Sequence, residues 1–169
     1  MMMMAVGDAL AGCLIERKGL TAEDFSKFHP GGSIGKRLLA KVRDVMHSGN
    51  ALPLVAADQT LKECLVPLSA KGMGAVVVVD DKTRLLGIFT DGDLRRALNC
   101  RDELLNQEIA SLMTKDPLVC APTAMAWEAM RMMEDRPSQI SLLPVVDSTR
   151  TVVGIIRIHD LVRYGFRNS

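Results

Sequence analysis

From residue 42 onward the chain contains two copies of one sequence pattern. The segment AVVVVD at 75–80 returns as LLPVVD at 142–147, and LGIFTDGDL at 86–94 returns as VGIIRIHDL at 153–161, both at an offset of 67 residues. The leading segments VRDVM at 42–46 and IASLM at 109–113 keep that offset, whereas PLV at 53–55 and at 117–119 are 64 residues apart. Loops absorb such changes in length readily. Because each copy is small for an independent core, the repeat predicts two modules that share one.

Each copy first predicts a helix. In the first copy Thr60 and Glu63 form a capping-box pattern, and apolar residues follow at helical spacing at 61, 65 and 68. The second copy has apolar residues at 125, 129 and 132. Pro67 has no amide hydrogen to donate, so we expect it to kink the first helix or to end it early.

Two strands and a second helix follow in each copy. The β-branched and apolar runs at 75–79 and 85–89 flank the turn-rich segment 80–84, which indicates a hairpin. A helix is expected from about 91–93 through 98, and its counterpart starts near Asp160. Each copy therefore reads as short strand, helix, strand, strand, helix, and the predicted fold class is α+β.

Composition excludes several functions. The 169 residues carry 21 Lys and Arg against 20 Asp and Glu, so a net charge of +1 provides no broad field for nucleic acid or an anionic membrane. Aromatic residues make up only 4% of the chain, too few for a base-stacking surface. The apolar run at 75–79 is far shorter than the roughly 20 residues of a membrane span, and no signal segment opens the chain. We expect a cytoplasmic protein with neither nucleic acid nor a membrane as partner.

The cysteines and histidines are dispersed. The four Cys residues show no C-x-x-C spacing, and the three His residues lie far from them in the sequence. We therefore expect neither a metal site nor a disulfide framework.

The block made of a strand, an Asp turn and Gly-apolar-apolar, ending in a helix start with Asp and Leu, resembles the signature of CBS modules, a family named after cystathionine β-synthase. The resemblance covers residues 42–165 and occurs in both copies. It implies two CBS modules, at 42–105 and 106–169, packed as a pseudo-twofold pair. Such pairs enclose clefts for adenine nucleotides or other phosphorylated ligands, so the resemblance implies a small phosphorylated ligand as partner.

Three residues of the first copy are candidate ligand contacts. Thr90 ends a predicted strand, and Asp91 and Asp93 begin the helix after it, which places a hydroxyl, free amides and carboxylates together. The hydroxyl and amides suit phosphate oxygens, and Asp93 suits two ribose hydroxyls. The alternative is that Thr90 or Asp91 simply caps the helix.

The second copy departs from the pattern. Arg157 replaces Thr90 and His159 replaces Gly92, whereas Asp160 matches Asp93. Arg157 has two possible roles, a bidentate phosphate clamp or an ion pair with a neighbouring carboxylate across the pseudo-twofold axis. His159 is either a pH-sensitive group or a solvated surface side chain. We expect the two clefts to differ, and the two Asp residues to line a shared crevice.

Residues 1–41 precede the repeat. Val6, Cys13 and Leu14 form part of a helical stripe, Gly19 is placed as a helix C-cap, and a short helix is expected at 21–24, before the stop at 29–30. The segments AVGDALA at 5–11 and FHPGGSIGKRL at 28–38, followed by a CBS pair, are similar to the end of the sugar isomerase domain of the KpsF/GutQ family.

That second resemblance implies a parent aldose–ketose isomerase, which interconverts D-ribulose 5-phosphate and D-arabinose 5-phosphate for the Kdo sugar of lipopolysaccharide or capsule. It assigns the position of His29 to the catalytic site as a general acid or base; the competing interpretation is a His at a helix end. Residues 1–41 would be the remnant of the isomerase domain and a linker. We expect the fragment alone to be inactive.

Two functions remain open at the level of sequence. In the first, the CBS pair is a regulatory sensor, with AMP, ATP or the nucleotide-linked sugar CMP-Kdo as its ligand and with no required cofactor. In the second, the pair is a ligand-independent oligomerisation module that forms a dimer or tetramer.

Overall fold

The computed structural model describes residues 6–7, 13–14, 16–19, 39–98 and 104–166. The chain divides into two compact units, Met1–Ala40 and Lys41–Ser169. In the first unit the described residues are mostly helical, and Gly19 has a positive φ of 60° with its amide bonded to the carbonyl of Glu16, as expected of a residue that ends a helix. The expected helix at 21–24 and the stop at 29–30 lie outside the described residues.

The first repeat forms an α+β module. Strand β1 (Leu54–Ala56) leads to helix α5 (Leu61–Ala70), and the hairpin of β2 (Ala75–Val79) and β3 (Leu85–Thr90) leads to helix α6 (Asp91–Leu98). β1 pairs with β2 in parallel, and β2 pairs with β3 antiparallel. This is the predicted order of elements.

Helix α5 differs from prediction at Pro67. The helix continues through Pro67 to Ala70, and the amide of Lys71 still bonds to the Pro67 carbonyl. The expectation that the helix ends early was therefore wrong. The predicted capping box is present, because Thr60 Oγ1 accepts from the Glu63 amide and the Glu63 carboxylate accepts from the Thr60 amide at 2.7 Å.

The second repeat forms the same module. Helix α8 (Ala126–Glu134) precedes the antiparallel hairpin of β5 (Leu142–Val146) and β6 (Val152–Arg157), and helix α9 (Ile158–Tyr164) follows. The counterpart of β1 is reduced to one parallel bridge between Cys120 and Val145.

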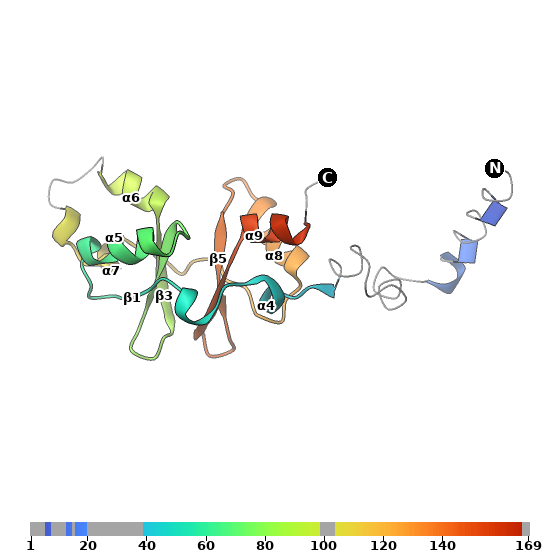
Figure 1. Ribbon diagram of the computed structural model, residues 1–169, viewed down its shortest axis with the longest axis horizontal. Helices are drawn as coiled ribbons and strands as arrows, with labels where there is room; N and C mark the ends of the chain where they lie inside the picture. Colours follow the sequence, from blue (N-terminus) through green and yellow to red (C-terminus); the bar gives the residue numbers. More distant parts are fainter. Residues whose placement is uncertain (1–5, 8–12, 15, 20–38, 99–103, 167–169) are drawn as a thin grey trace. The chain divides into compact units, whose positions relative to one another are not determined.

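The leading segment of each repeat packs on the other module. Helix α4 (Val42–Val45) contacts α8, α9 and β6, and His47 bridges Ile155. In the same way, helix α7 (Ile109–Leu112) contacts β3, and β4 (Thr114–Lys115) completes the first sheet in the order β1-β2-β3-β4. Figure 1 shows α4 beside α8 and α9, and α7 beside α5. The order of the chain therefore differs from the grouping of its elements in space.

Two glycines permit this exchange. A Cβ at Gly87 would lie 2.8 Å from the Thr114 carbonyl oxygen, and a Cβ at Gly154 would lie 2.9 Å from the His47 carbonyl oxygen. The side chains of Met113 and Met46 occupy the remaining space over these two glycines. Only a residue without a side chain allows the crossing segment to approach this closely.

Both faces of β2 are buried, because alternate residues of a strand point to opposite faces. Val76 and Val78 pack with α5 and Phe89 in the core of the first module. Ala75, Val77 and Val79 face a second core, to which both repeats contribute; its second-repeat members are Leu142, Val146, Val152 and Ile155. The predicted sharing of a core by the two copies is confirmed.

The two hairpins also meet at their turns. The Leu85 amide donates to the Arg150 carbonyl and the Val152 amide to the Thr83 carbonyl, each at 3.0 Å. Thr83 and Arg150 have matching φ values of 60° and 63°. The pairing thus follows the pseudo-twofold relation between the repeats. Over the described residues, the model contains no helix with the length and hydropathy of a bilayer span.

Candidate functional site

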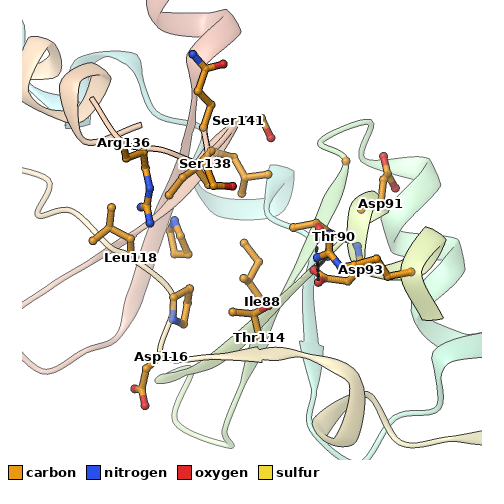
Figure 2. Close-up of a pocket in the computed structure, with 18 residues that line it drawn as sticks. Ile88, Thr90, Asp91, Asp93, Thr114, Asp116, Leu118, Arg136, Ser138 and Ser141 are labelled. Atoms are coloured by element: carbon orange, nitrogen blue, oxygen red, sulfur yellow. Dashed lines mark hydrogen bonds and ion pairs between the residues drawn. The ribbon is translucent and has the colours of Figure 1, made fainter. Parts of the chain in front are cut away.

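A cavity of about 580 Å³ lies between the two modules. In Figure 2, Thr90, Asp91 and Asp93 come from one side, and Arg136, Ser138, Ser141 and Leu118 come from the other. The volume lies within the range of small-molecule sites. The full lining consists of Gly74, Ile88, Thr90, Asp91, Gly92, Asp93, Arg96, Thr114, Asp116, Pro117, Leu118, Arg136, Ser138, Gln139, Ile140, Ser141, Leu142 and Pro144.

The junction of β3 and α6 positions the first wall. Asp93 Oδ2 accepts from the Thr90 amide at 2.9 Å and from Thr90 Oγ1 at 2.7 Å, and Thr90 Oγ1 accepts from the Asp93 amide at 3.2 Å. This is a reciprocal cap at the start of the helix. The capping interpretation is thus realised, and the same two residues also line the cavity.

Asp93 has a second partner in Arg96. Arg96 Nη2 donates to Asp93 Oδ1 at 2.6 Å, and the Asp93 side chain is 12% exposed whereas that of Arg96 is 74% exposed. A carboxylate oxygen can accept from two donors, so Oδ1 keeps the capacity to accept from a ligand hydroxyl. Arg96 also brings a positive charge to the cavity, next to the start of α6.

Asp91 is placed by a backbone contact at the neck of the cavity. The Asp91 amide donates to the Gly74 carbonyl at 3.0 Å, which joins the start of α6 to the start of β2. Gly74 has a positive φ of 70°, and a Cβ there would lie 3.2 Å from Asp91 Oδ2. The Asp91 side chain is exposed at the cavity rim.

The opposite wall is a loop of the second repeat. Arg136, Ser138 and Ser141 lie between α8 and β5, and all three are exposed. Ile88, Leu118 and Ile140 supply apolar surface between the polar groups. Two guanidinium groups, three hydroxyls and an aliphatic surface together can hold an anionic group beside a flat apolar one.

The corresponding residues of the second repeat have another arrangement. Arg157 Nε donates to Asp160 Oδ2 at 2.7 Å and Arg157 Nη2 to Asp160 Oδ1 at 3.0 Å, a two-point ion pair. Arg157 Nη1 donates to the Gly72 carbonyl at 3.1 Å. Of its two predicted roles, Arg157 takes that of an ion pair, with a carboxylate of its own repeat.

His47 completes this group. His47 Nε2 lies 2.9 Å from Asp160 Oδ2 and 3.3 Å from Arg157 Nη2. One nitrogen cannot donate to the carboxylate and accept from the guanidinium at once, so the shorter contact is assigned as Nε2–H donating to Asp160. Burial alone raises the pKa of Asp160, but the hydrogen bonds from Arg157 and His47 outweigh it, so the pKa lies below its ordinary value.

The structure brings only half of the predicted residues together. Thr90, Asp91 and Asp93 line the cavity, whereas Arg157 and Asp160 do not. The expectation of a crevice lined by both Asp93 and Asp160 was wrong, because each Asp caps its own module and faces a different leading segment. His159 is exposed on α9, and His29 lies outside the described residues.

Sequence reasoning missed several residues of both groups. Arg136, Ser138 and Ser141 belong to a loop without periodicity, so no pattern indicated them. Thr114 lines the cavity and His47 contacts Asp160, and these two residues are 67 positions apart in the chain. The repeat offset therefore was a signal that could have paired them.

Comparison with known proteins agrees with this architecture. The model of the CBS domain matches residues 42–100 and 109–167. CBSX2, a CBS-pair protein from Arabidopsis thaliana that was solved in complex with AMP, has a TM-score of 0.65 and 27% sequence identity, and the match covers 73% of this chain and 94% of that one.

Two curated relatives cover most of the chain. An arabinose 5-phosphate isomerase KdsD of Pseudomonas aeruginosa is 45% identical over 96% of this chain and 49% of its own length. The KdsD of Yersinia pestis is 40% identical over 96% of this chain and 48% of its own length. The chain thus spans about half the length of the curated relatives it matches. With both repeats matched and the paired architecture present, the chain belongs to the CBS domain family.

Proposed function

We propose that the unit Lys41–Ser169 is a regulatory sensor that binds a nucleotide or nucleotide-sugar in the cavity between its modules. The observation that carries this proposal is the joining, around one cavity, of the Thr90–Asp93 cap with Arg96 and Arg136. The ligand's phosphate would lie near the two arginines and the loop hydroxyls. Its ribose hydroxyls would donate to Asp93, and its base would lie on Ile88, Leu118 and Ile140.

The nature of the walls supports a ligand-dependent role. One wall belongs to the first repeat and the other to the second, so a bound ligand would contact both modules at once. A ligand that binds one relative position of the modules more tightly than another shifts the equilibrium between them. This is the physical basis on which a sensor can bias an attached domain.

The regulated activity in this proposal is that of a cytoplasmic sugar-phosphate isomerase that interconverts D-ribulose 5-phosphate and D-arabinose 5-phosphate. Its support is the similarity to the KdsD enzymes over 96% of the chain. Residues 1–41 would then be the end of the isomerase domain with its linker, residues 42–105 and 106–169 the two modules, and His29 a catalytic acid or base of the whole enzyme.

Two ligand classes fit the cavity chemistry. AMP or ATP is supported by the CBSX2 neighbour, which was solved with AMP. CMP-Kdo is the end-product alternative, because it also combines a base, a ribose and a phosphate. The two classes differ in base and in the size of the group beyond the phosphate, so competition between them reports on the same site.

Isothermal titration calorimetry of the 169-residue chain with AMP, ATP and CMP-Kdo tests the proposal. Arg136→Ala removes an exposed guanidinium from the cavity wall, and we expect affinity to fall about ten- to hundredfold. The matched control is Arg131→Ala, which removes the same group from α8, where Arg131 is 69% exposed and pairs with Asp135. The control should bind as the unaltered chain does.

Absence of heat with all three ligands would overturn the sensor proposal. Sedimentation of the same samples decides the alternative of an oligomerisation module: a concentration-dependent dimer or tetramer that no ligand changes would favour it. A shift in association on ligand binding would instead support the sensor.

A further inference from the structure

The second repeat contains a pseudo-symmetric counterpart of the cavity wall. At the repeat offset of 67 residues, Thr90 corresponds to Arg157, Asp93 to Asp160, and Thr114 to His47, while the loop residue Gln139 corresponds to Gly72. The first-named residue of each pair lines the cavity. The second-named residues should therefore surround an equivalent position on the other side of the pseudo-twofold axis.

At that position the polar groups are already in use. The Arg157 guanidinium donates to both oxygens of Asp160 and to the carbonyl of Gly72, and it lies 3.3 Å from His47 Nε2. These are the counterparts of the three cavity positions at Asp93, Gln139 and Thr114. One side chain of the protein thus takes the contacts that a ligand would need.

The contacts are also shielded from water. The side chain of Asp160 is 12% exposed, that of Arg157 is 23% exposed and that of His47 is 34% exposed. Breaking a two-point Arg–carboxylate pair in such a place costs more than breaking an exposed ion pair. A ligand would have to displace Arg157 before it could reach Asp160.

We infer that Arg157 is an internal plug of the second position, and that each pair of modules accepts a single nucleotide-type ligand, in the cavity of Thr90 and Asp93. This inference rests on the proposed function of that cavity. It assigns to Arg157 the control of stoichiometry: a threonine at this place, as at position 90, would free Asp160 and leave room for a second ligand.

The test is the binding stoichiometry of AMP, measured by calorimetry on the 169-residue chain and on three variants. We expect one AMP for the unaltered chain and two for Arg157→Thr. Arg136→Ala, which alters only the first cavity, should lose the single event, and the double variant R136A/R157T should keep one. Circular dichroism and thermal unfolding establish that each variant is folded.

The outcomes separate the two proposals. Two AMP on the unaltered chain, or one on folded R157T, overturns the plug. No AMP on the unaltered chain but one on R157T overturns the proposed sensor cavity for this ligand and supports the plug; no AMP on either overturns both.

If R157T does not fold, Arg157→Lys replaces it. A single ammonium cannot hold both oxygens of Asp160 and the Gly72 carbonyl together, so a second, weaker binding event is expected. Its absence would overturn the plug.

Discussion

Asp93 and Asp160 stand at the same position of the two repeats and have different partners. Asp93 accepts from Thr90 of its own helix cap and from Arg96, whereas Asp160 accepts from Arg157 and from His47, a residue of the other repeat's leading segment. The same carboxylate therefore leaves one position open to a ligand and closes the other. The difference begins with one substitution, Arg157 in place of threonine.

Asp160 predicts a pH-dependent contribution to stability. Its pKa is lower in the folded chain than the ordinary value near 3.9, so its contribution is fully present above about pH 4 and is lost as pH falls through the folded-state pKa. Asp160→Asn should cost about 1.5–3 kcal/mol at pH 7, the range for hydrogen bonds to charged groups. Urea denaturation of both chains at pH 7 and near pH 2.5 measures the difference.

The comparison isolates Asp160 from other acids. Glu63, Asp80 and Asp147 also have lowered pKa values, through hydrogen bonds in their caps and turns, but both chains contain them. The free energy difference between the two chains should therefore shrink at low pH. A difference of the same size at both pH values would contradict the assignment.

The exchange of leading segments predicts that Gly87 and Gly154 do not tolerate a side chain. In either variant, Gly87→Ala or Gly154→Ala, the new Cβ would meet a backbone carbonyl within 2.9 Å, which forces the crossing segment to move. We expect each change to cost about 1–3 kcal/mol in the free energy of unfolding, the range for overpacking. Urea denaturation measures it.

Gly92→Ala is the control for these glycines. A Cβ at Gly92 would have its nearest neighbour at 3.5 Å, an ordinary contact, and Gly92 lies inside α6. Alanine favours a helix over glycine, so this variant should change stability by about 1 kcal/mol or less. Equal losses in all three variants would argue against the close approach.

The sequence predicts the modules well because their elements are set locally. The run of valines at 75–79 and the Thr60–Glu63 cap specify a strand and a helix start wherever the module lies. The exchange of α4 and α7 was not predictable in this way, because either arrangement satisfies the same local pattern. Only the match of Gly87 with Met113, and of Gly154 with Met46, selects it.

The candidate site was predictable only on its first wall. Thr90, Asp91 and Asp93 follow one another at the end of a strand, so a motif identifies them. Arg136 comes from a loop 40 or more positions later in the sequence, and its place depends on how the modules pack. The choice of Arg157 between a ligand and Asp160 likewise depends on distances that no motif contains.

Cys64 and Cys120 should be unreactive in the folded chain. Burial, followed for Cys64 by the charge of Glu63, raises the pKa of Cys64 to about 11, and burial raises that of Cys120 to about 12. In a C13S/C100S variant, both remaining thiols should react with a disulfide reagent at pH 8 ~100-fold or more slower than in urea.

The C100S single variant is the control for thiol reactivity, since it retains Cys13, which is exposed. One thiol of that variant should react rapidly without denaturant. Rapid reaction of two thiols in folded C13S/C100S would contradict the burial of Cys64 and Cys120.

Pro67 predicts a stabilising substitution. Helix α5 continues three residues beyond it, yet Pro67 cannot donate the hydrogen bond that an amide at this place would give to the Glu63 carbonyl. Pro67→Ala restores that bond, and the loss of proline's restriction of the unfolded chain offsets part of the gain. We expect a net stabilisation of about 1–2 kcal/mol by urea denaturation. Val66→Ala, at a position that is 70% exposed in the same helix, should change stability little. A loss of stability in Pro67→Ala would show that the proline ring packs productively where it stands, and that the helix is held through Pro67 by its contacts with the sheet.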